Sequence, residues 1–204
     1  MARMGLSITT ANLEAAGIGA FFRPRDLAPL GTTFRQLQHL VAQGVVERVG
    51  AGLYRLTEVE PTERETIAMV GSAVPKAIVC LLSALSVHEI GTQLPHEVWI
   101  ALDRKARKPA RVPAQLRIVR FSGVMLTYGV IRMPMQGVRV AITSPARTVV
   151  DCFRYRRKIG LDVAMEALRD AVRGRKATVD EIWRAADVGR IQTVMGPFMD
   201  FLSA

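Results

Sequence analysis

Residues 32–56 read TTFRQLQHLVAQGVVERVGAGLYRL, and this segment holds the most informative pattern in the chain. Its first half has apolar side chains every three or four positions, which predicts a helix over residues 32–43 with one buried face. The apolar residues are Phe34, Leu37, Leu40 and Val41. The polar residues left exposed are Thr33, Arg35, Gln36 and His39. Gly44 ends this helix, and the β-rich runs 45–49 and 53–56 around a glycine-containing turn predict a β-hairpin.

Two shorter helices are expected before this segment. Residues 11–16 can form a helix that Gly17 ends, and a second helix begins at Pro24, since proline is favourable in the first helical turn. Between them, Phe21 and Phe22 predict a brief extended piece. Three helices followed by a hairpin are the outline of a winged helix-turn-helix, which we assign to residues 1–58.

A hinge is expected at residues 57–61, where acidic residues flank Pro61, so the second domain covers residues 62–204. Its first helix should start at Thr62, in a capping pattern with Glu65. A buried strand at 77–81 and a short helix from an N-cap at Ser83 to His88 follow. Further strands are expected at 98–102, 116–121, 130–133 and 138–142. Four helices close the chain, at 144–153, 161–173, 178–186 and 193–202. The fold class is therefore α+β, with a central, mainly antiparallel sheet and C-terminal helices.

Composition narrows the class of protein. Half of the 204 residues are hydrophobic, which excludes a disordered chain, and the net charge of +10 points to an acidic partner, usually nucleic acid. Most of the basic surplus lies after residue 58. Cys80 and Cys152 both lie in apolar runs, so a disulfide framework is not expected. No apolar run is long enough for a membrane span and no signal-like block is present, so we expect a cytoplasmic protein without a membrane partner.

The exposed face of the third helix is the candidate DNA-reading surface. Arginine can pair with guanine and glutamine with adenine, and a recognition helix needs such side chains beside positive charge. The candidate base-contacting residues are Thr33, Arg35, Gln36 and His39. The candidate phosphate-contacting residues are Arg23, Arg25, Arg48 and Arg55. The alternative is that these residues form only the solvated face of a packing helix.

Two basic clusters stand out in the second domain. The first contains Arg104, Lys105, Arg107 and Lys108. The second contains Arg154, Arg156, Arg157 and Lys158. Each cluster can follow phosphates, but a run of like charge is also typical of a solvated loop. The second cluster further lies at a predicted helix C-terminus, where cations interact favourably with the helix dipole.

Signals for an enzyme are few. The three histidines are scattered, and neither a paired-cysteine metal spacing nor a phosphate-binding glycine loop is present. Asp151 follows Arg147 by four residues, which favours an exposed or half-buried ion pair over catalysis. A metal-dependent nuclease needs clustered carboxylates, and Glu97 and Asp103 do not form such a set in the sequence. We therefore expect no catalytic residues, no metal and no cofactor.

Several segments resemble the AbiEi family of antitoxins from type IV toxin-antitoxin systems. The resemblance begins with QGVVERVGAGLYRL at 43–56, which is similar to the family's helix-to-wing segment. In the second domain it includes LLSALS at 81–86, TQLPHEVW at 92–99 and VRFSG at 119–123. It continues with TSPARTVVDCFRYR at 143–156, KIGLD at 158–162 and RKAT at 175–178. Together these segments span nearly the whole chain.

The resemblance implies a protein with two functions. The winged helix would bind inverted repeats in double-stranded DNA of its own promoter and repress the operon. The C-terminal domain would counteract a nucleotidyltransferase-like toxin without needing a tight complex. A further hypothesis is that the basic clusters of residues 62–204 neutralise the toxin by binding its RNA substrate or the toxin itself. Relatives often carry a basic residue at the wing tip, where this chain has Ala51. The alternative is a stand-alone winged-helix transcriptional regulator whose C-terminal domain senses a ligand or mediates assembly.

Overall fold

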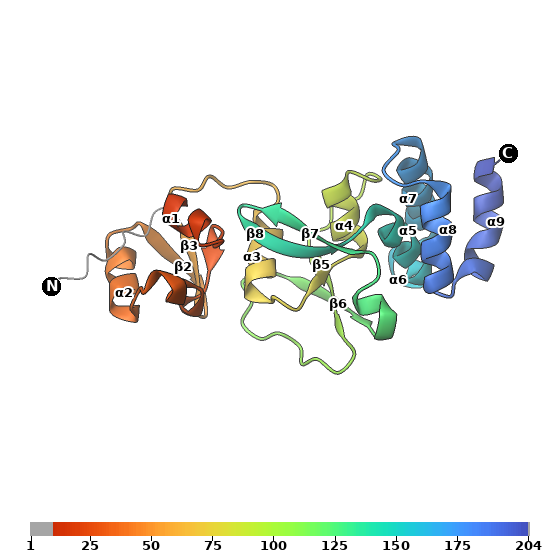
Figure 1. Ribbon diagram of the computed structural model, residues 1–204. Coiled ribbons are helices and arrows are strands. Elements are labelled where there is room, and N and C mark those ends of the chain that lie inside the picture. Colours follow the sequence, from red (N-terminus) through yellow and green to blue (C-terminus); the bar gives the residue numbers. More distant parts are fainter. Residues whose placement is uncertain (1–9, 204) are drawn as a thin grey trace. The chain divides into compact units, whose positions relative to one another are not determined.

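The computed structural model describes residues 10–203, and Figure 1 shows the helices and strands along the chain. Residues 1–9 and 204, which include the start of the predicted first domain, lie outside the described residues. Contacts between residues divide the chain into two compact units. The first contains residues up to Lys76 together with 107–115 and 132–140, and the second contains 77–106, 116–131 and 141–204.

The first unit contains short elements around a small sheet. The helical elements are α1 (Thr10–Ala15), the 3-10 helix η1 (Pro24–Leu30), α2 (Phe34–Ala42) and α3 (Glu65–Ala73). The strands β1 (Phe21–Phe22), β2 (Val46–Gly50) and β3 (Leu53–Leu56) form an antiparallel sheet in the order β1-β3-β2. The predicted hairpin is thus confirmed, and β1 adds a third strand to it. The predicted second helix is a 3-10 helix, in which Pro29 lacks the N–H that a regular helix would need.

A small apolar core holds these elements together. Leu13 of α1, Leu27 of η1 and Leu37 of α2 are all buried against the sheet. On the sheet, the rings of Phe22 and Tyr54 stack with their centroids 6.2 Å apart. Because each helix contributes one buried leucine, its other faces remain available for solvent or a partner.

The division by contacts differs from the predicted boundary at residues 59–61. Helix α3 belongs to the first unit, because the Ser72 hydroxyl donates to the Phe21 carbonyl at 3.1 Å and Glu65 pairs with Arg55 at 2.9 Å. The helix also begins at Glu65 rather than Thr62, with Arg64 at the N-cap position and no side-chain cap. The predicted capping box at Thr62 is therefore wrong, since the Thr62 carbonyl accepts from Glu65 N in a turn before the helix.

The larger sheet has five strands in the order β6-β5-β4-β8-β7; β4, β5 and β6 belong to the second unit, and residues 132–140 of β7 and β8 are grouped with the first. Its strands are β4 (Ile78–Val79), β5 (Val98–Asp103), β6 (Leu116–Phe121), β7 (Val130–Met135) and β8 (Val138–Thr143). The prediction of a mainly antiparallel sheet needs correction, because β5 pairs with β6 and β4 pairs with β8 in parallel. β4 and β5 are antiparallel. The sheet is mixed because the connection 104–115 returns the chain to the starting end of β5 before β6 begins.

In residues 77–203, most helical elements follow the last strand, as the sequence predicts for an α+β chain, but the first two lie between strands. These helical elements are α4 (Leu81–His88), η2 (Gly123–Leu126), α5 (Pro145–Arg154), α6 (Arg156–Ile159), α7 (Leu161–Arg173), α8 (Val179–Val188) and α9 (Gln192–Ser203). α5, α7, α8 and α9 lie where they were predicted, while η2 and the four-residue α6 were not predicted. Ser83 does not cap α4, because its hydroxyl bonds with Trp99 N and the Glu97 carbonyl instead.

The core of the second unit packs α5 against the later helices, and Figure 1 shows α7 and α8 beside α5, with α9 on the far side of α8. In residues 10–203, every helix falls short of the length and apolar character needed to cross a membrane.

Candidate nucleic-acid interface

Helix α2 presents a polar face away from the core of the first unit. Leu37 is 1% exposed and anchors the opposite face, while Arg35 and His39, four residues apart, are both exposed. Within residues 10–203, the side chains of Arg35 and His39 make neither a hydrogen bond nor an ion pair. Their donors are therefore available to a partner that approaches this face.

The first turn of α2 is fixed by two of the predicted base-contacting residues. The Thr33 hydroxyl accepts from Gln36 N at 3.3 Å, and Gln36 Oε1 accepts from Thr33 N at 2.8 Å, which forms a capping box. The Thr33 hydroxyl also donates to Gln36 Oε1 at 2.9 Å. Because the Gln36 oxygen already has two donors, pairing of this amide with both adenine groups requires opening the cap.

Phe34 differs from the prediction, which placed it in the buried stripe. Its side chain is 63% exposed, although it lies three residues before the buried Leu37. It is the first residue of α2, where the helix extends beyond the apolar core, so the repeat of apolar positions does not bring it inside. An apolar ring therefore lies beside Arg35 at the exposed N-terminal end of the helix.

The hairpin after α2 carries one available arginine. Arg48 of β2 is exposed, and its Nε donates to the Gly50 carbonyl at 3.2 Å, close to the Ala51-Gly52 turn. This bond leaves the other guanidinium donors of Arg48 for a phosphate. Arg25 of η1 is also open to solvent, with a side chain that is 66% exposed and 3.7 Å from Asp26.

Two of the predicted phosphate-contacting arginines are instead engaged inside the first unit. Arg55, with a side chain only 12% exposed, pairs with Glu47 and Glu65 at 2.9 Å each and donates to the Val59 carbonyl at 2.7 Å. Arg23 donates to the Ala73 carbonyl at the end of α3. Alternating polarity in a strand does not reveal such partners, because Glu65 and Ala73 come from a helix later in the chain.

The predicted basic clusters of the second domain also separate into two groups. Arg154 Nη1 donates to the Gly189 carbonyl and Arg156 Nη1 to the Phe153 carbonyl, both at 2.8 Å, so these two side chains bind helix ends. The remaining cluster residues are exposed. They are Arg104, Lys105, Arg107, Lys108, Arg157 and Lys158. Arg107 and Lys108 are grouped with the first unit and the others with the second.

The segment 144–148, in contrast, forms the start of a buried helix. Ser144 caps α5 by accepting from Arg147 N, and Pro145 occupies the first turn. The Thr148 hydroxyl is 2.7 Å from that of Thr143. These local patterns explain why the position of α5 was predicted correctly.

Arg147 and Asp151 form an ion pair with no exposed side-chain area, whereas the sequence suggested an exposed or half-buried pair. Arg147 Nε lies 3.0 Å from both carboxylate oxygens of Asp151, and its Nη1 and Nη2 donate to the carbonyls of Tyr128 and Met125. The guanidinium also lies 4.9 Å from the ring centroid of Phe121. Burial raises the pKa of Asp151 to about 6, against the opposing effect of Arg147.

The backbone beside the Arg147–Asp151 pair requires a glycine at position 129. A side chain at Gly129 would place its Cβ 2.8 Å from Arg147 Cβ, and Gly129 has a φ of +61°, in the left-handed region. The backbone at Gly129 therefore lies directly against Arg147, and a residue with a side chain would not fit there.

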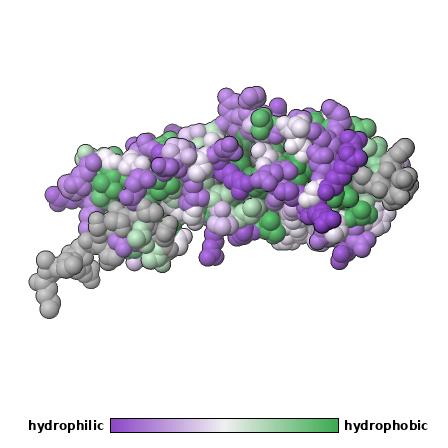
Figure 2. Space-filling view, turned by 90° about the horizontal axis from the view of Figure 1, so that it is seen from above, coloured by the Kyte–Doolittle hydropathy of each residue, from purple (hydrophilic) through white to green (hydrophobic). Residues whose placement is uncertain are grey.

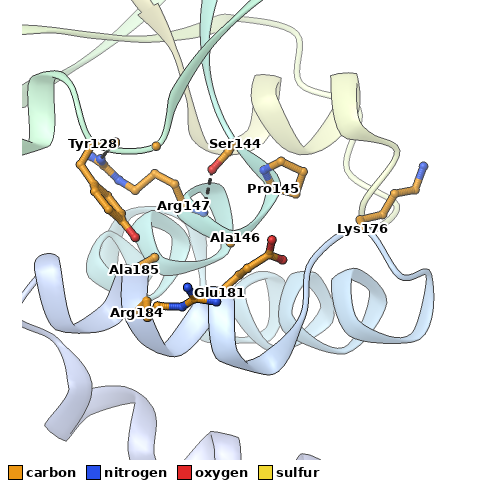
Figure 3. A pocket seen from close by; sticks show the side chains of 10 residues that line it. Tyr128, Ser144, Pro145, Ala146, Arg147, Lys176, Glu181, Arg184 and Ala185 are labelled. Atoms are coloured by element: carbon orange, nitrogen blue, oxygen red, sulfur yellow. Dashed lines mark hydrogen bonds between the residues drawn. The ribbon is translucent and has the colours of Figure 1, made fainter.

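A pocket of about 310 Å³ opens beside the start of α5, and Figure 3 shows its lining side chains from α5, α8 and the segment around Tyr128. Its charged groups already have partners. Lys176 pairs with Glu89 at 3.0 Å and Arg184 Nε donates to the Asp180 carbonyl at 3.3 Å. Glu181 is held by Thr178, whose N–H and hydroxyl lower the pKa of that carboxyl.

In residues 10–203, no group of three or more His, Cys, Asp or Glu side chains could hold a metal ion. Cys80 and Cys152 are buried thiols, and burial raises the pKa of each. Such thiols are poor nucleophiles.

Figure 2 shows hydrophilic side chains over much of the visible face, with apolar residues in smaller groups between them. Comparison of the sequence with protein-family models and with curated proteins finds no match.

Proposed function

We propose that this chain is a DNA-binding antitoxin that represses its own operon, with α2 as the recognition helix. The observation that carries the DNA-binding part is the exposed pair Arg35 and His39, which face away from the buried Leu37 without partners in residues 10–203. Arginine in the major groove can donate two hydrogen bonds to guanine, and histidine can donate one.

The surrounding elements support this assignment. A helix, a strand, two further helical segments and a hairpin follow one another in residues 10–56, which is the order of a winged helix-turn-helix. In that arrangement the last helix enters the major groove and the hairpin approaches the backbone. Arg48 on the hairpin and Arg25 on η1 are both exposed and take the phosphate-binding role.

Phe34 adds a base contact that the sequence pattern did not predict. An exposed phenylalanine at the start of a recognition helix can contact the methyl group of thymine. Gln36 and Thr33 then serve mainly to fix the first turn, so that Phe34, Arg35 and His39 are held in position by the cap.

The antitoxin part of the proposal rests on the AbiEi-like segments of the second unit. It predicts that a neighbouring gene encodes a nucleotidyltransferase-like toxin, whose growth arrest is relieved when this chain is expressed with it. The alternative of a ligand-sensing regulator receives less support, because the charged groups around the pocket at α5 already bind one another or the backbone.

Fluorescence anisotropy tests the DNA-binding part directly. The full chain is titrated onto the duplex upstream of its own reading frame and onto a scrambled duplex of equal length, in a series of salt concentrations. We expect a preference for the upstream duplex that persists as salt rises, since contacts to phosphates alone would weaken equally on both duplexes. Equal binding to both duplexes at every salt concentration would contradict operator recognition.

The variant Arg35→Ala tests whether α2 is the surface that recognises the operator. It should reduce the preference roughly ten- to a hundredfold, because one arginine–guanine pair contributes about 1–3 kcal/mol of discrimination. Arg169→Ala is the matched control, since Arg169 is an equally exposed arginine on α7 and its loss removes the same charge. Relief of growth arrest by the Arg35→Ala chain should remain. An unchanged operator preference in Arg35→Ala would remove α2 from the interface.

A further inference from the structure

Parts of the two basic clusters, far apart in the sequence, are attached to the end of β6 within the second unit. On one side, Arg120 Nη1 donates to the carbonyls of Asp103 and Ala106, at 2.9 Å and 2.7 Å. Arg104 N also donates to the Phe121 carbonyl at 3.0 Å. The segment that carries Arg104 and Lys105 is therefore attached to residues 120–121.

The second cluster reaches the same two residues from the helical side. The Tyr155 hydroxyl donates to the Arg120 carbonyl at 3.0 Å, and the Tyr155 ring lies against Phe121 with centroids 6.5 Å apart. Lys158 Nζ is 5.7 Å from the centroid of the Tyr155 ring. Tyr155 thus joins the α6 segment to the end of β6, where the loop after β5 is also attached.

We define the basic patch as the exposed cations of these joined segments. They are Arg104, Lys105, Arg120, Arg157 and Lys158. Across residues 10–203, none of these five side chains forms an ion pair, whereas Arg117 on the same strand is neutralised by Glu97 at 3.0 Å. The Asp103 carboxylate accepts from the backbone N–H of Lys105 at 2.7 Å, so it orders the loop.

We propose that the basic patch binds the phosphodiester backbone of nucleic acid without reading its sequence. Closely spaced phosphates are the partner that a group of adjacent unpaired lysines and arginines fits best. The Tyr155 ring lies against Phe121 on one side and near Lys158, so it does not serve as a platform for base stacking. Contacts from this patch are thus to phosphates, and they are independent of base identity.

This surface goes beyond operator recognition by α2. It belongs to the other unit of the chain and includes Arg120, which the sequence pattern did not single out. It leaves out Arg154 and Arg156, whose guanidinium groups donate to the Gly189 and Phe153 carbonyls and so do not join the loop after β5, as Arg120 does.

The test uses the full chain and two probes of equal length, a duplex DNA of scrambled sequence and a single-stranded RNA. Binding is measured by anisotropy across a salt series for Arg104→Gln/Lys105→Gln and for Arg157→Gln/Lys158→Gln. Each double variant should lower the slope of log affinity against log salt by roughly 1.8 on duplex or 1.4 on a single strand. The probe with the larger loss of affinity identifies the form of nucleic acid that the patch binds.

Arg169→Gln/Arg173→Gln is the matched control, because it removes two exposed arginines from α7 and changes the net charge by the same amount. Thermal unfolding midpoints equal to that of the control establish that the patch variants fold. Slopes of both patch variants that equal the control slope on both probes would overturn the proposal. Arg35→Ala should bind these non-operator probes like the wild type, so loss of operator recognition and loss of patch binding are measured separately.

Discussion

Helices α2 and α5 start in the same way and differ in what surrounds them. Each begins at a hydroxyl cap, Thr33 or Ser144, and each carries an arginine in its first turn. Arg35 is exposed and unpaired within residues 10–203, whereas Arg147 has no exposed area and binds Asp151 together with two carbonyls. A capped helix with an early arginine is therefore a structural signal, and only burial distinguishes an arginine that can bind a partner from one that supports the fold.

The two arginines differ in exposure because α2 and α5 pack against different numbers of helices and strands. α2 lies against one small sheet and buries a single residue, Leu37. α5 packs against α4, α7 and α8, and residues 146–153 are all buried. A charged residue in such a position must be paired, because a buried guanidinium without a partner is very costly. The comparison predicts that substitutions of the two arginines affect different properties of the protein.

The largest effect on stability should come from Arg147→Met. This change leaves Asp151 buried without its cation and should lower the free energy of unfolding by roughly 3–5 kcal/mol near neutral pH. Urea unfolding followed by tryptophan fluorescence measures it, because Trp99 and Trp183 both belong to the second unit. The double variant Arg147→Met/Asp151→Leu should recover much of the loss. A double variant as unstable as the single one would mean that packing volume, and not the ion pair, sets the cost.

The cost of Arg147→Met should also grow as the pH rises. Burial raises the folded-state pKa of Asp151 from 3.8 to about 6. Because the folded chain holds this proton more tightly than the unfolded chain, the stabilisation from Asp151 protonation is complete below about pH 4 and is lost as the pH rises through about 6. Arg147 opposes the shift, so its removal raises the folded-state pKa of Asp151 further and increases the loss at neutral pH. In urea titrations, the difference in free energy of unfolding between the wild type and Arg147→Met should be small at pH 4.5 and large at pH 7.5. Equal differences at both pH values would contradict this coupling.

Substitutions of the two hairpin arginines, Arg55 and Arg48, should have smaller effects, one on stability and the other on DNA binding. Arg55→Gln should destabilise the first unit by about 1–3 kcal/mol, because it breaks contacts with Glu47, Glu65 and the Val59 carbonyl. Arg48→Gln should change stability by less than about 0.5 kcal/mol but should lower the salt slope of operator binding by about 0.9. Hydrogen exchange of the β2 and β3 amides measures the first property, and anisotropy measures the second. The reverse pattern would show that Arg55, and not Arg48, is the phosphate contact.

Local sequence patterns predicted the elements better than they predicted the role of charged residues. The predicted helices at 178–186 and 144–153 are confirmed as α8 and α5, and their starts are fixed by the capping box at Thr178 and by the Ser144 cap with Pro145, which involve only neighbouring residues. The strand directions in the larger sheet were missed, since a long connection and not a local motif sets them. Arg55 and Arg154 were taken for ligand contacts because their partners, Glu65 and Gly189, lie on segments that only the folded chain brings near.

The smallest predicted effect concerns Phe34, whose exposure sharpens the contrast between the two helices. Phe34→Ala should leave stability within about 0.5 kcal/mol of the wild type, because the ring is 63% exposed and fills no cavity. It should weaken operator binding by about tenfold or less, through loss of a contact to a thymine methyl group. Leu94→Ala is the control, since Leu94 is 83% exposed but lies in the second unit, and its loss should change neither property. A destabilised Phe34→Ala chain with unchanged DNA binding would instead mean that the start of α2 packs like α5.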